Sequence, residues 1–165
     1  MVSHPIPPLY NHDSEILILG SFPSIKSREG AFFYNHPQNR FWYVLSHILN
    51  MPLPISIKEK REFILNNKIA LWDVIKSCDI VNSSDSSIKN ITTNDIDFIL
   101  KSSNVKMIFT NGAKASELYK KYIYPKVNIK AICLPSTSPA NAKYTLDKLY
   151  EEWSIIKAYL FQENS

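Results

Sequence analysis

The chain of 165 residues contains two cysteines, three glycines and no long apolar run. Cys78 and Cys133 are far apart and lie in apolar surroundings, so we expect two buried core thiols and no disulfide framework, zinc site or iron–sulfur cluster. A membrane-spanning helix needs about 20 apolar residues in succession, which the sequence does not offer. The first residues also lack the basic start and apolar core of a signal peptide. We therefore expect a cytoplasmic protein with no membrane partner.

Several catalytic signatures are missing as well. The sequence has no glycine-rich phosphate loop with its lysine and no GxGxxG, which removes support for nucleotide hydrolysis and dinucleotide redox chemistry. It also has no GxSxG elbow and no paired metal-binding histidines, so we expect neither a metal nor another cofactor. The net charge of +4 and the pI near 9.0 are compatible with a polyanionic partner but are common in proteins without one.

The length and composition are those of one globular domain. Hydrophobic residues make up 45% of the chain and aromatic residues 12%. A chain of this size buries roughly two-thirds of the surface that it exposes when unfolded. We expect a single domain that spans residues 1–165 and acts as a monomer.

Short apolar segments alternate with segments of helical spacing. The segments predicted as buried strands are 15–20, 68–72, 105–109 and 129–134. The predicted helices are 41–49, 56–65, 95–101, 113–122 and 144–160, the second opening with the capping-box pattern SIKE. Apart from its one short helix, the polar region 77–103 is expected to be a long loop. The alternation predicts an α/β fold, a three-layer αβα sandwich around a four-stranded, mostly parallel sheet.

Polar and aromatic residues follow the predicted strands directly. In open parallel sheets ligands bind beyond the carboxyl ends of the strands, so these loops should form one site. The stretch GAFFYNHPQNRFW at 30–42 combines aromatic rings, a His-Pro pair, side-chain amides and an arginine. This mixture is suited to a pocket wall that sandwiches and reads a planar heterocycle.

Four motifs in these loops resemble those of a known family. They are GSFPS at 20–24, YNHPQNRFW at 34–42, LWD at 71–73 and LPSTSPAN at 134–141. Together they are similar to the uracil-DNA glycosylase superfamily, and most similar to its branch of hypoxanthine- or deoxyinosine-directed glycosylases. The resemblance implies a uracil-DNA glycosylase-like fold and hydrolysis of the bond between a damaged base and deoxyribose, after the nucleotide is flipped out of the duplex. Damaged DNA is then the partner, and base excision repair the setting.

Two positions depart from the better-known branches of that family. Phe22 stands where the mismatch branch has a water-handling asparagine, and Leu134 stands where a His or Asn precedes Pro-Ser. Uracil excision by the usual residues is therefore not expected. The resemblance to the hypoxanthine branch instead implies Asn39 as the catalytic residue. Its amide oxygen can accept from a water while its NH2 donates to base or sugar; alternatively, Asn39 caps the helix that follows it.

Asp73 is the second catalytic candidate. It matches the position from which the uracil branch reads its base with an asparagine, and a carboxylate there can accept the N1–H of hypoxanthine or act as a general base. The alternative is that it braces the loop after its strand. Three further residues are expected to hold the base: Tyr34 by stacking, Phe22 on the opposite face, and His36, unless His36 only ties its own loop to the backbone.

Hydroxyl, amide and basic side chains in the same loops suit contacts with DNA phosphates, although an ordinary Ser-Pro turn is the alternative for some of them. The predicted DNA-binding residues are Ser24, Lys26, Ser136, Thr137, Ser138, Asn141 and Lys143. The bulky wedge that the family places soon after Pro-Ser is not evident. Two other functions stay open from the sequence: a mismatch-type uracil-DNA glycosylase, and a non-catalytic nucleic-acid-binding module on the same fold.

Overall fold

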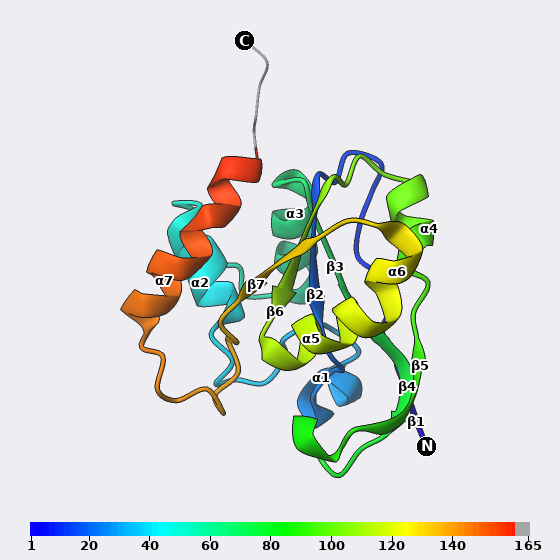
Figure 1. Ribbon diagram of the computed structural model, residues 1–165. Helices are drawn as coiled ribbons and strands as arrows, with labels where there is room; N and C mark the ends of the chain where they lie inside the picture. Colours follow the sequence, from blue (N-terminus) through cyan, green and yellow to red (C-terminus); the bar gives the residue numbers. More distant parts are fainter. Residues whose placement is uncertain (161–165) are drawn as a thin grey trace.

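The computed structural model of the chain describes residues 1–160. Its centre is a four-stranded parallel sheet with the strand order β3-β2-β6-β7 (Figure 1). The strands are β2 (Ile16–Gly20), β3 (Ile69–Asp73), β6 (Met107–Asn111) and β7 (Ala131–Leu134). Gly20 pairs with Asp73 at the carboxyl end of β2 and β3, which brings the residues after each strand to one edge of the sheet. The predicted fold class is confirmed.

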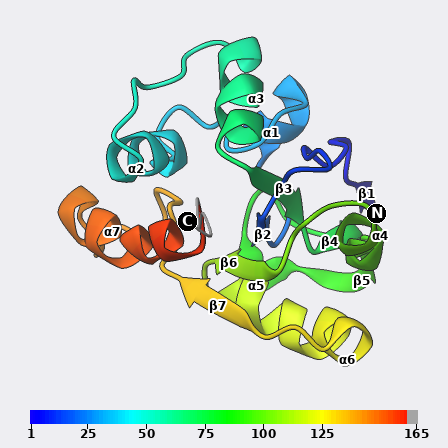
Figure 2. The same cartoon turned by 90° about the horizontal axis from the view of Figure 1, so that it is seen from above.

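Helices cover both faces of this sheet, as the view from above makes clear (Figure 2). One face is covered by α2 (Phe41–Ile48), α3 (Ile57–Asn66) and α7 (Leu146–Trp153). The other is covered by α4 (Ile96–Lys101), α5 (Ala113–Leu118) and α6 (Tyr124–Val127). Successive side chains of a strand point to opposite faces, so β2 contributes Ile16 and Ile18 to one core, and Leu17 and Leu19 to the other. All four are fully buried.

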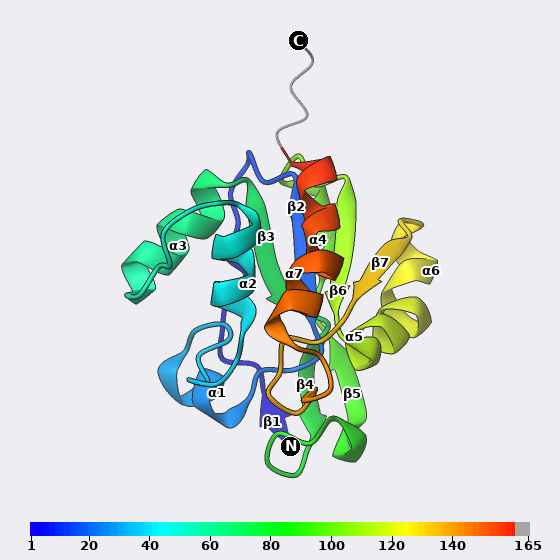
Figure 3. The same ribbon diagram turned by 90° about the vertical axis from the view of Figure 1, so that its left-hand side faces the viewer.

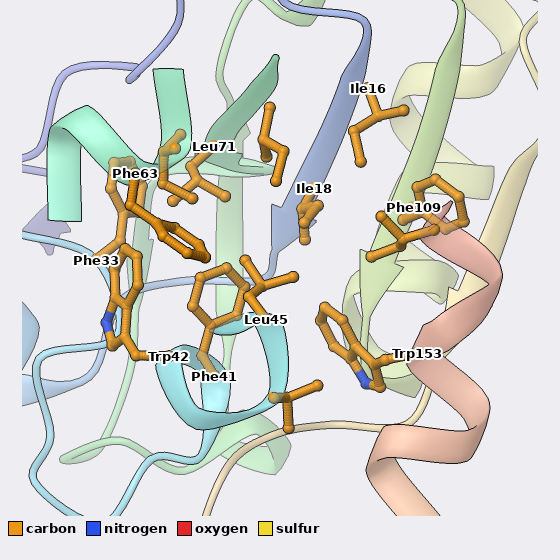
Figure 4. Packing of buried hydrophobic residues seen from close by; sticks show 14 of the residues in the cluster. Ile16, Ile18, Phe33, Phe41, Trp42, Leu45, Phe63, Leu71, Phe109 and Trp153 are labelled. Carbon is orange, nitrogen blue, oxygen red and sulfur yellow. The ribbon is translucent and has the colours of Figure 1, made fainter. Parts of the chain in front are cut away.

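The core beneath α2 and α7 is rich in aromatic rings (Figure 4). Phe33, Phe41, Trp42 and Trp153 are all at most 5% exposed, and the Phe41 ring meets that of Trp153 edge to face at 5.9 Å. Burying one such side chain contributes about 1.5–3 kcal/mol. Phe33, Phe41 and Trp42, which flank the HPQN turn, are therefore core residues. They anchor the pocket wall to the sheet.

The region 77–103 is more ordered than predicted. It contains the second half of β4 (Ile75–Asp79) and all of β5 (Lys89–Thr93), which form an antiparallel sheet with β1 (Val2–Ser3) in the order β1-β4-β5. The assignment of a long loop was wrong there. Irregular register along the β4–β5 pairing breaks the alternation of buried and exposed residues that would have marked the strands.

The capping box of Ser56 and Glu59 is present at the start of α3, as predicted. The helices differ from the predictions at four places. A short helix α1 (Ile25–Gly30), capped by Ser24, and a short 3-10 helix η1 (Asp85–Ser87) were not predicted. The segment after α5 continues as a π-helix, η2 (Tyr119–Ile123), into α6, and α7 passes into a 3-10 helix, η3 (Ser154–Tyr159). No helix within residues 1–160 is long and apolar enough to cross a membrane.

The two cysteines differ in burial. Cys78 is buried, as expected. Cys133 is exposed, which corrects the expectation of two core thiols. The physical reason is that β7 lies at the edge of the sheet with only β6 beside it, and of its four residues only Leu134 is buried.

Candidate active site

A pocket of about 340 Å³ opens at the carboxyl ends of the strands. Figure 3 shows α1 and the segment that leads into α7 gathered at this end of the sheet. The pocket is lined from every strand-end loop, by Gly20 to Ser24, Asp73, Asn111 and 136–138, together with Tyr34 and Asn39. A larger and more open depression of about 780 Å³ lies between α2 and α7 and receives none of these residues. Most of the predicted site residues therefore converge on the smaller pocket; His36, Lys26, Asn141 and Lys143 do not line it.

Asn39 lies two residues before the start of α2, and its amide oxygen is fully engaged. Oδ1 accepts the backbone N–H of Phe41 at 3.0 Å and the hydroxyl of Thr137 at 2.8 Å. Because a backbone N–H can only donate, the first bond settles which end of the amide is the oxygen. Asn39 thus bonds the start of the helix, the alternative considered above, and lines the pocket as well. Its NH2 is the group left for a bound base.

A short relay of side chains holds Asn39. Asn111, at the end of β6, donates from Nδ2 to the Thr137 hydroxyl at 3.1 Å, and its Oδ1 accepts the backbone N–H of Thr137 at 3.1 Å. The Thr137 hydroxyl accepts from Nδ2 of Asn111 and donates a hydrogen bond to Oδ1 of Asn39. Thr137 is fully buried, and its hydroxyl and N–H are both used. It braces the site and has no group free for a phosphate, which differs from its predicted contact.

Asp73 lies at the floor of the pocket and is 4% exposed. Its Oδ2 contacts Nε2 of His4 at 2.7 Å, and its backbone carbonyl accepts from the side chain of Asn94. Gly20 on the neighbouring strand makes room for the carboxylate, because a Cβ there would stand 2.3 Å from Oδ1 of Asp73. Sequence reasoning missed His4, since a single histidine 69 positions away carries no signal of this contact.

Aromatic rings form two sides of the pocket. Tyr34 adopts a positive φ of 50°, and its ring is stacked on Phe41 with centroids 3.9 Å apart, so at most its other face can receive a base. The Tyr34 hydroxyl is buried with no hydrogen-bond partner. Burial and the nearby Asp73 raise the pKa of Tyr34. The Asn111 side chain offsets part of this rise, although the Tyr34 hydroxyl makes no hydrogen bond of normal geometry with it. The hydroxyl is therefore a neutral donor.

Phe22 forms another side of the pocket and is 9% exposed. Its ring meets His4 edge to face, with centroids 6.0 Å apart, and the Arg28 guanidinium lies 5.3 Å from its centroid. These contacts hold the ring against the pocket. His36 does not line this pocket: its Nδ1 accepts the N–H of Gln38, and it faces a neighbouring depression. The structure thus favours the alternative that His36 shapes its own turn.

The predicted phosphate contacts divide into two groups. Ser24, Ser136 and Ser138 line the pocket, but each hydroxyl oxygen already accepts a local backbone N–H. The side chain of Asn141 is also engaged, because it donates to the carbonyl of Ser136. The second group consists of Lys26 and Lys143, which are exposed and basic. Arg40, which sequence reasoning did not single out, donates to the backbone carbonyls of Ser138, Asn141 and Tyr144. Its place in the HPQNRFW motif was the only available signal.

Asp85 brings a second carboxyl group to the rim of the pocket. The Ser21 hydroxyl donates to its Oδ1 at 3.1 Å, and 83–86 line the pocket opening. The residue as a whole stays exposed, yet desolvation of its carboxyl group raises the pKa of Asp85, while Ser21 and Lys114 lower it. This segment lies in the region predicted as a loop, and no motif marked it.

Comparisons with known proteins identify the family of this chain. A family model described as the uracil DNA glycosylase superfamily matches residues 7–159. The chain belongs to the uracil DNA glycosylase superfamily. A solution NMR structure of a provisionally named uracil DNA glycosylase from Methanosarcina acetivorans superimposes on this superfamily member with a TM-score of 0.81, at 30% identity, covering 94% of this chain and 96% of that one.

Two curated relatives carry the same name. A protein named hypoxanthine DNA glycosylase from Methanosarcina acetivorans is 30% identical over 158 residues, which is 94% of this chain and 98% of that protein. Its namesake from Methanosarcina barkeri is 38% identical over 114 residues, which is 67% of this chain and 72% of the relative. The predicted resemblance to the superfamily is thereby confirmed.

Proposed function

We propose that this superfamily member is a monofunctional DNA glycosylase that flips a deaminated base out of damaged DNA and hydrolyses its bond to deoxyribose, with hypoxanthine as the preferred base. The two relatives named hypoxanthine DNA glycosylase support this activity. The observation that carries it is the position of Asn39, whose amide is held by Thr137 and Phe41 on the wall of the pocket. The chain acts as a single domain and as a monomer.

The burial of the two candidate residues divides their roles. Asp73 is deeply buried at the floor of the pocket, where the far edge of a flipped base arrives, and its carboxylate accepts the N1–H of hypoxanthine. Asn39 is only half-buried, so we assign it to the sugar side of the base, beside the glycosidic bond. Phe22 and Tyr34 enclose the base between apolar surfaces.

Glycosidic cleavage leaves positive charge on the sugar and negative charge on the departing base. A donor that is already oriented stabilises the base as this charge develops and needs no reorganisation at that moment. The NH2 of Asn39 is such a donor, because its oxygen is engaged by two other donors and the amide cannot turn over without losing both bonds. Asn39 therefore assists base departure, and its engaged oxygen is not free to accept from the attacking water.

The test uses duplexes that carry a single hypoxanthine, a uracil opposite guanine, or no damaged base. Abasic sites are detected as strand breaks after alkali, and the released base is identified by mass spectrometry. We expect hypoxanthine release to exceed uracil release, and no release by an Asn39→Ala preparation, which controls for contaminating enzymes. Faster release of uracil would contradict the choice of base, whereas duplex binding without release of either base would favour a binding module.

A further inference from the structure

The N-terminal segment delivers one side chain to the floor of the pocket. His4 follows β1, and its backbone N–H donates to the carbonyl of Lys76 on β4 at 2.7 Å. Its Nε2 lies 2.7 Å from Oδ2 of Asp73, and the two side chains are only 2% and 6% exposed. Backbone pairing fixes both residues of this short, buried contact: His4 bonds to β4, and Asp73 belongs to β3, which pairs with β2.

The hydrogen bonds of His4 determine its protonation. Nδ1 lies 3.1 Å from the backbone nitrogen of Ile6, whose N–H can only donate, so Nδ1 carries no proton. The proton of the ring is then on Nε2 and points at Asp73. The ring cannot readily turn, because it packs against Phe22 and Phe33 with centroids 6.0 and 6.4 Å away. His4 is therefore a neutral donor with a single orientation.

This arrangement leaves Asp73 as an acceptor toward the pocket. His4 donates to Oδ2 but is neutral, so it leaves the negative charge of the carboxylate in place, whereas a lysine or arginine would neutralise it. Oδ1, the other oxygen, lies beside Gly20. The unpartnered Tyr34 hydroxyl also lies beside Gly20, 3.3 Å from the position of a Cβ there. Buried polar groups nearly always have a partner, so this floor is built for a ligand with a polar edge.

We propose that His4 is a positioning residue, which holds one oxygen of Asp73 so that the other accepts the N1–H edge of a flipped 6-oxopurine. The inference rests on the proposed function and extends it to base choice. Hypoxanthine presents a donor at N1, and a carboxylate pairs with it. Adenine presents a lone pair at N1, which a fixed carboxylate repels.

Three variants separate positioning from simple packing. His4→Phe keeps an aromatic ring against Phe22 and Phe33 but removes the donor to Asp73. His4→Gln places an amide NH2 near the position of Nε2 and restores a donor. His12→Phe is the matched control, because the side chain of His12 is 82% exposed and precedes β2, at the end of the sheet opposite the pocket. Thermal unfolding of each variant reports whether it is folded.

The readouts are the single-turnover rate of base release, the half-saturating protein concentration, and the preference for hypoxanthine over unsubstituted purine, which lacks the N1–H. We expect His4→Phe to slow hypoxanthine release by about 10- to 100-fold and to reduce the preference, because it leaves a buried carboxylate oxygen without a partner. Half-saturation should change little, since phosphate contacts dominate duplex affinity. His4→Gln should recover most of the rate, and His12→Phe should match the wild type.

Each outcome decides the proposal. An equal fall in release of both bases by His4→Phe, or a folded His4→Gln that recovers nothing, would overturn it and leave His4 a structural residue. If His4→Phe does not fold, His4→Gln alone decides, because the proposal requires it to keep the wild-type preference. If the wild type and His4→Phe release hypoxanthine equally fast, the positioning role alone is refuted. If the wild type releases no hypoxanthine, the proposed function and this inference are refuted together.

Discussion

The hydroxyl of Thr137 donates to the amide oxygen of Asn39 at 2.8 Å, although the two residues are 98 positions apart. The bond joins the loop after β7 to the turn that precedes α2, and Asn111 extends it to the end of β6. The amide of Asn39 is therefore oriented before any base arrives. Orientation of this kind is the main way in which a weakly acidic donor becomes useful in catalysis.

Replacing Thr137 by valine tests this relay. Thr137→Val keeps the shape of the side chain and the backbone bond to Asn111 but removes the two hydroxyl bonds, to Asn39 and to Nδ2 of Asn111. We therefore expect hypoxanthine release to slow by about 10- to 100-fold and the free energy of unfolding to fall by about 1–3 kcal/mol. Thr137→Ser keeps the hydroxyl and should release hypoxanthine nearly as fast as the wild type. Single-turnover strand cleavage measures the rates; a valine variant as fast as the wild type would show that Asn39 needs no brace.

Gly20 is predicted to tolerate no side chain. The Cβ of Gly20→Ala would stand 2.3 Å from Oδ1 of Asp73, a carboxylate already fixed by His4, so Asp73 must be displaced and base release lost. Gly30→Ala is the matched control, because its Cβ would meet the end of the Asn35 side chain, which can move away. Release assays and thermal unfolding of both variants check the prediction, and an active Gly20→Ala would argue against Asp73 as the floor of the pocket.

Tyr119 is predicted to make the fold sensitive to alkali. Its hydroxyl donates to the carbonyl of Ile129, and burial, with a smaller effect of Tyr124, raises the pKa of Tyr119 from 10.0 to about 12. The unfolded chain loses this proton first, so the contribution of Tyr119 to stability is complete below pH 10 and is lost as the pH rises through about 12. Urea unfolding between these values should show a falling free energy of unfolding.

Tyr119→Phe has no proton to lose, so its free energy of unfolding should fall less steeply with pH, although near neutral pH it should be about 1 kcal/mol less stable than the wild type. Tyr43→Phe changes a tyrosine that is 49% exposed and should keep the wild-type slope. Equal slopes for all three chains would contradict the assignment of the alkaline loss to Tyr119.

The central sheet and the convergence of its loops could be predicted from sequence because both follow from local patterns. The residues of β2 are uninterruptedly apolar, as in a strand buried on both faces, and alternation of strands with helices requires parallel pairing. Parallel pairing in turn brings Asp73, Asn111 and 136–138 to one edge. Asn39 joined this set through its motif and not through any periodicity.

The contacts that orient the site could not be predicted in this way. The pairing of His4 with Asp73 depends on an antiparallel strand of two residues, too short to leave a pattern. The bracing role of Thr137 depends on which way a hydroxyl in a Ser-Pro turn points, and the exposure of Cys133 depends on the order of the strands. These are properties of tertiary packing, which no local segment encodes by itself.

The most direct test of the account is the single-turnover rate of hypoxanthine release by Asn39→Asp, beside Asn39→Ala and the wild type. A carboxylate at position 39 can still accept from Thr137 and Phe41 but replaces the NH2 donor by an oxygen. Asn104→Ala, an exposed asparagine before β6, serves as the control. The account predicts that Asn39→Asp melts close to the wild-type temperature and releases hypoxanthine at least about 100-fold more slowly, as expected for loss of one oriented donor. Release by Asn39→Asp at the wild-type rate would contradict it.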